Sequence, residues 1–310
     1  MKLPRVSIII LNWNGAEDTI ECLESLKNIN YPCYNVIVVD NGSRDKDAEL
    51  LKERFGAYIH LIENARNDGF TGGVNVGMKY VRDNCQADYI LLLNNDTVVA
   101  PGFLSEMVRV VDRDPTIGIA GAKIFYYDEP EQLQSVYCRV NLLTGQPIQT
   151  PLMIDGNIRH RVTDRGQYDS IKEVDWVTGC CFLIKRVVME GIGLLDERYF
   201  YYWEETDYCY RGRQAGYKTI YVPQARVRHK GGRSVKKVWG RSRYYMERNR
   251  FLFMKRHATT WQYRLFLIYF FGIHVWLATG YFLIICHSIE LVSNFYHGVW
   301  DGLFYHPRGA

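Results

Sequence analysis

This sequence alternates repeatedly between apolar, β-branched runs, polar turns and amphipathic helices, and few folds are compatible with that pattern. The runs predict strands at residues 6–11, 36–39, 58–62, 91–94 and 118–125. Helical patterns follow at 18–26 and 48–55, from 78 onward, and after Pro101. Strand, polar turn and helix in succession predict parallel strands joined by crossover helices. We therefore expect an α/β fold with a doubly wound sheet.

The second half of the chain is less regular. From 126 to 175 the sequence predicts only polar loops and a hairpin region, to which we assign no role. An apolar stretch at 174–184, interrupted by Gly179, predicts a further strand and a short helix after it. The acidic run that opens at Glu204 predicts a helix to about Gln214.

Polar side chains gather where three of the predicted strands end. They are Asn12 and Asn14 after the first strand, Asp40 and Asn41 after the second, and Asn94, Asn95 and Asp96 at the fourth. Ligands of doubly wound sheets bind at the shared C-terminal edge of the strands. Asp40 is suited to accept hydrogen bonds from a nucleobase or ribose, and Asp96 to hold a divalent cation against a diphosphate.

A glycine-rich segment, NARNDGFTGGVNVG at 64–77, lies between the third and fourth strands. We expect it to be a loop whose backbone N–H groups approach a diphosphate, with a helix starting near Met78. Asn67, Gly69, Gly73 and Asn75 are the candidate contacts. The segment is neither G-x-G-x-x-G nor a P-loop, so an ordinary glycine-rich turn is an equal alternative.

One carboxylate makes a weak metal site, so Asp96 needs a further ligand. His229, in the segment RVRHKGGRS, is the best candidate, because a neutral imidazole suits Mn²⁺ and oxygen ligands suit Mg²⁺. The alternative for a lone histidine in a basic stretch is an exposed side chain that binds nothing.

A general base is the remaining requirement, and Glu204, Glu205 and Asp207 can supply one. A helix N-terminus favours their ionised form, whereas neighbouring carboxylates and aromatic side chains raise their pKa. The two effects together predict a usable base near neutral pH. A purely structural interpretation also exists, because acids at the start of a helix and Arg211 and Arg213 near its end suit the helix dipole.

Charge is distributed unevenly along the 310 residues. Residues 1–225 carry a net charge of −7, residues 226–256 a net charge of +11, and residues 257–310 are balanced. The eight cysteines form no C-x-x-C pair and no zinc-ligand spacing, which favours a reducing compartment. The apolar run at the N-terminus is too short for a signal peptide.

The C-terminal segment predicts contact with a membrane. Leu265 to Cys286 is 22 residues without Asp, Glu, Lys or Arg, which corresponds to about 33 Å of helix. Because the basic block precedes it, residues 1–256 are expected on the cytoplasmic face. A helix that lies in the interface, or that packs in a homo-oligomer, is an equal alternative to a spanning helix. Nucleic-acid binding is disfavoured, since no recognisable fold motif accompanies the basic block.

Seven motifs occur in an order that resembles family 2 glycosyltransferases of the GT-A fold, particularly rhamnosyltransferase-like members. They are VSIIILNWNG, VVDNGSRD, NDGFTGGVNVG, LLLNNDTVVAPGFL, WVTGCCFLIKR, FYYWEETDYCYRGRQAGY and VRHKGG. The match covers roughly residues 5–256. It implies a Rossmann-like, mixed but mainly parallel sheet flanked by helices. It also implies an inverting transferase that uses a nucleoside-diphosphate sugar with Mg²⁺ or Mn²⁺.

The resemblance also assigns roles to residues. Asp40 would contact the nucleoside, Asp96 would end the D-x-D motif, His229 would be a further metal ligand, and Glu205 would be the base, with Glu204 as second choice. The full set of expected donor contacts is Asn12, Asn14, Asp40, Asn41, Asn67, Gly69, Gly73, Asn75, Asn94, Asn95, Asp96, Trp176 and Gly179. Two departures from the family pattern are Asn94 at the first acidic position of D-x-D and Glu in place of Asp at 205.

The expected organisation is a catalytic domain at 1–225, a basic loop and helix at 226–256 that completes the active site, and membrane-associated helices at 257–310. The expected acceptor is a hydroxyl of a lipid-linked saccharide or another glycan, with polyprenyl phosphate as the alternative. A sugar nucleotidyltransferase is less favoured, because NWNGAEDT is not the lysine-containing loop it needs. A non-catalytic nucleotide-sugar-binding protein would not need the carboxylates at 204, 205 and 207.

Overall fold

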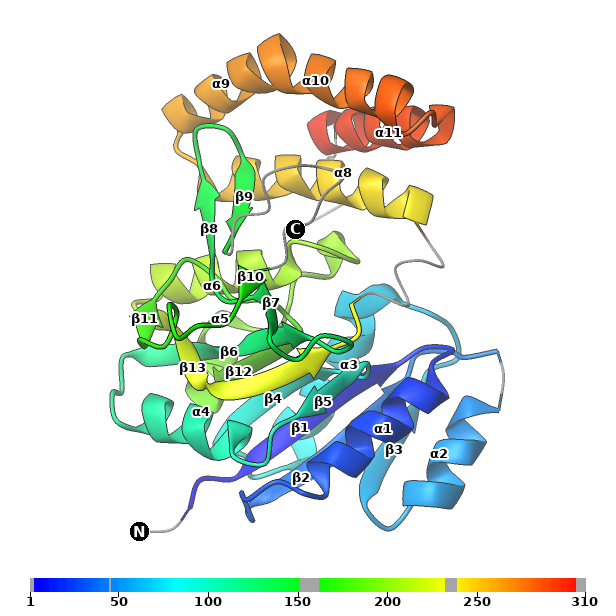
Figure 1. Cartoon of the computed structure of the whole chain (residues 1–310), viewed down its shortest axis with the longest axis vertical. Coiled ribbons are helices and arrows are strands. Elements are labelled where there is room, and N and C mark those ends of the chain that lie inside the picture. Colours follow the sequence, from blue (N-terminus) through cyan, green and yellow to red (C-terminus); the bar gives the residue numbers. More distant parts are fainter. Residues whose placement is uncertain (1–2, 45, 151–161, 232–238, 305–310) are drawn as a thin grey trace.

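The computed structural model describes residues 3–44, 46–150, 162–231 and 239–304. A large mixed sheet with helices on both faces forms the lower body of the molecule, and a layer of long helices lies above it (Figure 1). Strands run in the order β10-β7-β6-β12-β4-β1-β2-β3, and β13 adds to β6. The α/β fold with a mixed sheet flanked by helices is therefore confirmed.

The parallel part of the sheet comes from the N-terminal third of the chain. β1 (Val6–Asn12) pairs in parallel with β2 (Tyr34–Asp40) and β4 (Tyr89–Asn94), and β2 pairs with β3 (Ile59–Glu63). The strands form because their β-branched and leucine side chains are buried on both faces of the sheet. The crossover helices are α1 (Ala16–Leu26), α2 (Asp47–Phe55) and α3 (Gly69–Asn84). The register of the parallel strands brings Asn12 beside Asp40, and Leu11 beside Asn94.

The prediction of a glycine-rich loop up to Gly77 is wrong, because α3 already begins at Gly69. The glycines are needed for packing. A Cβ atom on Gly77 would lie 2.6 Å from Ile9 Cγ2, and one on Gly73 would lie 2.4 Å from Leu11 Cδ1. Glycine thus lets α3 lie directly on β1, and this close approach outweighs the low helix propensity of glycine.

Antiparallel strands complete the sheet on its other side. β12 (Cys181–Lys185) runs between β4 and β6 (Ile117–Tyr126), and β13 (Lys218–His229) pairs with both β6 and β5 (Thr97–Val99). The helices of this half are α4 (Phe103–Asp112), α5 (Arg186–Ile192) and α6 (Glu204–Gln214).

The strand predicted at 174–184 begins only at Cys181. The residues before it pair elsewhere, since the Val174 N–H donates to the Thr219 carbonyl and Trp176 forms an isolated bridge with Cys138. The irregular region contains the expected hairpin, formed by β8 (Cys138–Asn141) and β9 (Gln146–Gln149). Three short strands accompany it, namely β7 (Gln132–Ser135), β10 (Val162–Thr163) and β11 (Lys172–Glu173).

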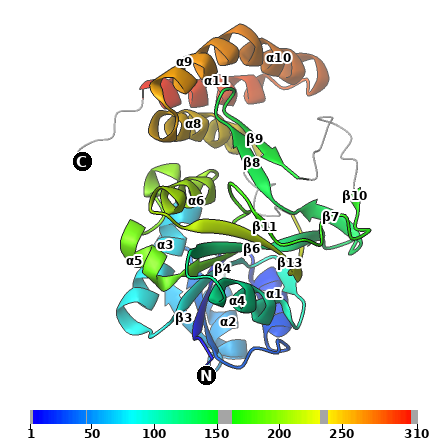
Figure 2. The same ribbon diagram turned by 90° about the vertical axis from the view of Figure 1, so that its left-hand side faces the viewer.

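The upper layer consists of α8 (Trp239–His257), a long helix above it and α11 (Ile289–Phe304) (Figures 1 and 2). The long helix comprises α9 (Thr260–Tyr269), η2 (Phe270–His274), α10 (Val275–Gly280) and η3 (Tyr281–Ile285), of which η2 and η3 are π-helical turns. In the described part of the chain, only this helix, Thr260–Ile285, is long and apolar enough to cross a membrane, by length and composition alone.

The long helix runs antiparallel to α8. Phe251 of α8 contacts the rings of Phe266 and Phe270, and Arg243 lies over the ring of Phe282. The β8–β9 hairpin reaches the same layer from below, where Gln146 Nε2 lies 3.1 Å from His274 Nδ1. The upper layer is therefore packed onto the sheet domain through α8 and this hairpin.

Candidate active site

The ends of β1 and β2 hold a buried carboxylate, Asp40. Its Oδ1 accepts hydrogen bonds from Asn12 Nδ2 at 2.7 Å and from Ser43 Oγ at 2.6 Å. Asn12 is fully buried, and its own Oδ1 accepts from Thr19 Oγ1. Both residues were predicted to contact the nucleotide-sugar donor. In the structure, Asn12 holds the Asp40 carboxylate in place.

The next polar residues join β2 to the start of α3. Asn41 Nδ2 donates to Asn67 Oδ1 at 3.0 Å and to the Gly69 carbonyl at 2.9 Å. Asn14, at the end of β1, has a left-handed backbone with φ of 48° and accepts from the Arg44 N–H. Asn14, Asn41, Asn67 and Gly69 therefore lie around the same end of the sheet as Asp40.

Several predicted donor contacts face the interior instead. Asn75 forms two hydrogen bonds with the backbone of Leu195 and is 1% exposed. Gly73 lies under Leu11, and Trp176 is buried in the hydrophobic core. We therefore withdraw Asn75 and Gly73 as donor contacts, because packing accounts for both. Asn95 points back to α1, where its Nδ2 donates to Thr19 Oγ1 at 3.0 Å.

The predicted metal ligands lie side by side although they are far apart in the sequence. β13 pairs antiparallel with β5, so that His229 faces Thr97, and His229 Nε2 lies 3.0 Å from Asp96 Oδ1. Asn94 Nδ2 lies 3.4 Å from the same nitrogen. The other ring nitrogen of His229 is 2.6 Å from Gln134 Oε1, and a carbonyl oxygen there selects the tautomer with hydrogen on Nδ1.

The pair fits a divalent cation. In that tautomer the lone pair of Nε2 lies 3.0 Å from Oδ1 of Asp96, so that one nitrogen and one carboxylate oxygen could both bind a divalent cation. Within the described ranges, no group of three or more His, Cys, Asp or Glu side chains could hold a metal. Any further ligands would therefore include donor phosphate oxygens or water.

The two candidate bases, Glu204 and Glu205, open α6 and are both largely enclosed. Burial, together with the neighbouring Glu205 charge, raises the pKa of Glu204 well above its usual value. Burial also raises the pKa of Glu205, although backbone N–H groups, including that of Gly179, oppose the shift. In the part of the chain that is described, Oε2 of each carboxylate is buried without a hydrogen-bond partner. Both therefore favour protonation more strongly than ordinary glutamates do.

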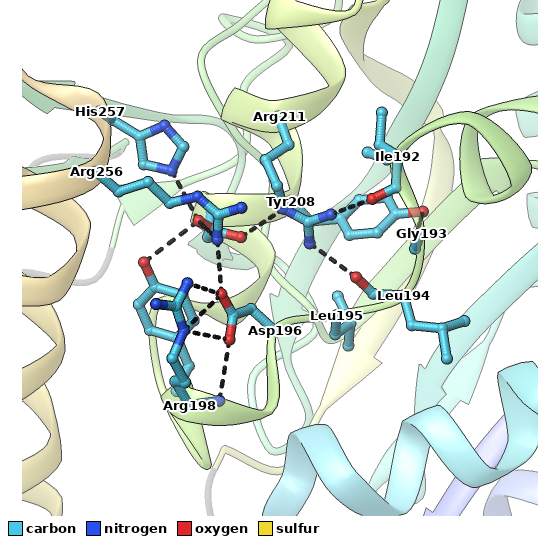
Figure 3. A network of polar contacts seen from close by, with 12 residues as sticks. Ile192, Gly193, Leu194, Leu195, Asp196, Arg198, Tyr208, Arg211, Arg256 and His257 are labelled. Carbon is cyan, nitrogen blue, oxygen red and sulfur yellow. Dashed lines mark hydrogen bonds and ion pairs between the residues drawn. The ribbon is translucent and has the colours of Figure 1, made fainter. Parts of the chain in front are cut away.

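The third candidate, Asp207, faces away from this edge. It is completely buried and bound to Arg211 Nε at 2.7 Å, His257 Nε2 at 2.7 Å and Arg256 Nη1 at 3.2 Å. Figure 3 shows these three side chains converging from α6 and α8. Burial raises the pKa of Asp207, but its hydrogen bond with His257 and the two guanidinium charges outweigh burial and lower it. Asp207 joins two helices, and we withdraw it as a base.

The end of β4 lies near both the metal pair and the residues next to Glu205. Asn94, at the end of β4, donates its N–H to the Cys180 carbonyl, one residue beyond the Gly179 that adjoins Glu205. Burial, Tyr202 and the charges of Glu204 and Asp96 raise the pKa of Tyr201, which lies in the turn before α6. Carboxylates that could hold a metal and accept a proton thus occur around one edge of the sheet.

Sequence reasoning missed three contributors to this edge. Gln134, which orients His229, lies in the region to which we assigned no role. Lys230 binds Asp18 at 2.6 Å and so fixes the end of β13 to α1. Asn249, in α8, binds the turn that precedes Glu204. Short-range sequence patterns carry no signal for any of them, because each partner is far away along the chain.

Solved structures share this fold. A mannosyltransferase from Pyrobaculum calidifontis, in complex with GDP-Man and Mn²⁺, matches 98% of this chain and 88% of its own, with a TM-score of 0.59 and 15% identity. S. aureus TarS 1–349 in complex with UDP-GlcNAc matches 96% of this chain and 80% of its own, with a TM-score of 0.61 and 13% identity. The sheet domain therefore has the GT-A fold of nucleotide-sugar-dependent glycosyltransferases.

The sequence profile described as "Glycosyltransferase like family 2" matches residues 4–246, and the chain belongs to this family. The low-salt glycan biosynthesis hexosyltransferase Agl10 of Haloferax volcanii is 27% identical over 73% of this chain and 66% of its own length. The N-acetylglucosaminyl-diphospho-decaprenol L-rhamnosyltransferase of Mycobacterium tuberculosis is 24% identical over 72% and 75%, respectively. The match to Agl10 thus spans just under two thirds of that relative, and the match to protein y4gI of Sinorhizobium fredii only 24% of it.

Proposed function

We propose that this protein transfers a sugar from a nucleoside-diphosphate sugar, with inversion, to a hydroxyl group of a lipid-linked saccharide or another glycan. The observation that carries this proposal is the 3.0 Å pairing of Asp96 with His229 at one edge of a GT-A sheet. Glu205, next to Gly179, supplies a carboxylate whose pKa is raised by burial. Asp40 would contact the nucleoside at the other end of the same edge.

Glu205 is the proposed general base. Because its raised pKa brings it closer to neutral pH, its ionised form can accept a proton from the acceptor hydroxyl. The hydroxyl oxygen then forms a bond to the anomeric carbon, while the bond from that carbon to the diphosphate oxygen breaks on the opposite face. Asp96 and His229 would hold Mg²⁺ or Mn²⁺, which supplies positive charge to the leaving diphosphate.

The names of the relatives support a finer assignment. One is an L-rhamnosyltransferase that acts on N-acetylglucosaminyl-diphospho-decaprenol, and another is a dTDP-rhamnosyl transferase, RfbF, of Shigella flexneri, 24% identical over 80% of this chain. We propose rhamnose as the sugar and a diphosphate-linked lipid saccharide as the acceptor. Polyprenyl phosphate itself is the second candidate. Membership of the glycosyltransferase family argues against a nucleotidyltransferase or a non-catalytic binding protein.

A panel of nucleotide sugars with Mn²⁺ tests this function. Release of nucleoside diphosphate and transfer to a lipid-linked N-acetylglucosaminyl diphosphate should be greatest with dTDP-rhamnose. Asp96→Ala should abolish Mn²⁺-dependent donor binding. Full turnover by Asp96→Ala, or in the presence of a chelator, would contradict the metal-assisted mechanism, and equal turnover with every donor would contradict the rhamnose assignment.

We also propose that the upper layer attaches the enzyme to the cytoplasmic face of a membrane. The support is an apolar outer surface on the long helix and α11. Its large exposed side chains are Trp261, Ile268, Phe271, Ile273, Trp276, Leu277, Leu283, Ile284, Ile285, Ile289, Tyr296, Trp300 and Phe304. Patches of this extent mark interaction sites, and the tryptophans suit the interface between lipid and water.

The same packing favours a helix that lies in the membrane surface over one that spans the bilayer. His274, at the middle of the long helix, lies 2.8 Å from Arg250 Nη1, and Glu247 Oε2 is 3.1 Å from that nitrogen. A spanning helix would carry these α8 charges into the hydrocarbon region, at a cost of several kcal/mol. Lying in the surface keeps α8 outside and places only the apolar face in lipid.

Cysteine labelling from one side of sealed vesicles separates the two arrangements. Single cysteines at Thr260 and His287, in a chain without other reactive thiols, should both react with an impermeant maleimide. Protection of one of the two would show a spanning helix. Trp276→Ser should weaken binding to anionic vesicles, whereas Val187→Ser, an exposed position on α5, should not. Equal binding of the two variants would contradict this attachment.

A further inference from the structure

The turn that leads into the candidate bases has an unusual backbone. Between η1 (Glu197–Tyr199) and α6, Phe200, Tyr202 and Trp203 have φ values of 50°, 69° and 75°. None of them is glycine, and bulky residues rarely adopt this left-handed conformation. Such a turn persists only where its surroundings hold it, and strained backbone of this kind gathers at functional sites.

One side chain of the upper layer holds the turn. The Nδ2 of Asn249, in the middle of α8, donates to the carbonyls of Tyr199 at 2.7 Å, Tyr201 at 2.8 Å and Tyr202 at 2.8 Å. Its Oδ1 accepts from Arg248 Nε at 2.9 Å. The two N–H bonds of the amide are shared among the three carbonyls, and the donor at Oδ1 completes the set of contacts that defines the orientation of the amide. Asn249 is fully buried, so water cannot replace these bonds.

Side chains on both sides complete the clamp. On the α8 side, the ring of Tyr245 stacks on Phe200 at 5.0 Å, and Phe253 lies 4.9 Å from Trp203. On the α3 side, the Thr71 N–H donates to the Phe200 carbonyl at 3.3 Å. The turn is thus enclosed between α3 and α8, and the Asn249 side chain binds three of its carbonyls.

We propose that Asn249 is a positioning residue whose amide holds this turn and thereby sets the position and the enclosure of the Glu205 carboxylate. Trp203 immediately precedes α6, so its backbone conformation determines where the first residues of that helix lie. Loss of the amide would remove a donor from three carbonyls, of which that of Tyr199 would keep the N–H of Tyr201. The turn would then relax to recover hydrogen bonds with water. The effect of Asn249 on catalysis by Glu205 rests on the proposed function, whereas its effect on the conformation of the turn does not.

Hydrogen exchange tests the structural part without any substrate. Asn249→Ala and Asn249→Asp should each speed amide exchange in residues 200–206 at least tenfold. Asp keeps the shape of Asn but, when ionised, has no N–H to donate, so it separates hydrogen bonding from size. Phe251→Leu is the matched control, because Phe251 lies on the same helix and contacts the long helix instead. Exchange as slow as in the wild type in Asn249→Asp would overturn the proposal.

Asn249→Ser provides a milder variant if the others fold poorly, because its hydroxyl can serve one carbonyl. Its exchange rate should lie between those of the wild type and Asn249→Ala. Exchange as slow as in the wild type would again contradict the proposal.

Kinetics tests the catalytic part. Asn249→Ala should lower kcat at least 30-fold, leave the KM of the donor within twofold, and move the acidic limb of the pH profile to lower pH, because water reaches Glu205. An unchanged pH profile, or an equal loss of kcat in Phe251→Leu, would overturn this part. A wild-type protein without transferase activity would refute the proposed function, while the exchange experiment would still decide the role of Asn249.

Discussion

The two sides of the candidate active site are built by different means. On the donor side, Asp40 ends β2 and Asp96 follows β4, with β1 between these two strands, and short polar contacts such as Asn12 to Asp40 fix this end of the sheet. On the base side, Glu204 and Glu205 follow a strained turn, and their position depends on a helix from the upper layer. The donor side is thus a property of the sheet, whereas the base side is a property of how α6 and α8 pack together.

The difference suggests that the two sides respond differently to mutation. Changes on the donor side should affect binding while the protein stays folded. Some substitutions around α6 should remove the group that accepts a proton and lower the activity. Others should break the contacts between α6 and α8 and lower the stability of the fold. Glu205 and Asp207, two positions apart on α6, provide the sharpest test.

Glu205→Gln should have the largest effect on activity. It keeps the shape of the side chain but cannot accept the proton, so kcat should fall about 10³-fold, equivalent to roughly 4 kcal/mol of transition-state stabilisation. In the wild type, kcat should fall as the pH drops through the raised pKa of Glu205. Steady-state kinetics across pH provides the measurement. Transfer at the wild-type rate would exclude Glu205 as the base.

Asp207→Asn should have the largest effect on stability. It leaves Arg211, Arg256 and His257 without their buried counter-charge, which should cost about 3 kcal/mol, since Arg256 is partly exposed. Because folding lowers the pKa of Asp207, its contribution is present above the usual pKa and is lost as the pH falls through the lowered one. Urea unfolding at pH 7 and pH 3 should show a smaller difference at pH 3. A stable but inactive variant would restore Asp207 as a base candidate.

Gln134→Ala should weaken metal binding by about 10- to 100-fold, because His229 loses the partner that selects its tautomer. Titration with Mn²⁺ in the presence of donor measures this effect. Gln132→Ala, two residues away, is the control, since Gln132 binds Thr163 instead. Equal affinity in the Gln134 and Gln132 variants would remove Gln134 from the site.

Gly77→Ala should have the smallest effect, on stability alone. The added Cβ would lie 2.6 Å from Ile9 Cγ2, and the cost of overpacking less the gain in helix propensity leaves about 1 kcal/mol of destabilisation. Gly102→Ala meets no heavy atom within 4 Å and should change the stability by less than about 0.5 kcal/mol. Thermal unfolding of both variants provides the comparison. An effect on donor KM from Gly77→Ala would show that α3 also affects the donor site.

The contrast between the two sides also explains what the sequence could predict. The strand ends were predictable because a buried strand and its polar terminus are neighbours in the chain, as in LLLNND at 91–96. The pairing of Asp96 with His229 was predicted from the ligand preferences of Mg²⁺ and Mn²⁺ and from the family resemblance, whereas no local pattern links the two residues. The glycines of α3 were wrongly predicted to form a diphosphate-binding loop. Glycine is needed both in such a loop and where a helix lies close to a strand, as α3 does at Ile9.

The errors on the base side have a different cause. Asp207 has the same local pattern as Glu205, and only its partners on α8, Arg256 and His257, show that it serves packing. Nothing in the local sequence around Asn249 indicates that its amide binds a turn about 50 residues earlier. Roles of this kind are set by tertiary contacts, which periodicity and spacing do not encode.

The pairing of Asp96 with His229 has a thermodynamic consequence for the whole domain. The two residues are separated by 132 others, about two fifths of the chain, and that stretch contains β12 and α6. Only the folded domain brings the two residues together, so an ion that binds both of them would bind the folded state alone. The free energy of metal binding would then add to the free energy of folding. Mn²⁺ and the nucleotide-sugar donor should therefore raise the melting temperature together. The metal concentration in the cell would then affect the resistance of the enzyme to unfolding as well as its turnover rate.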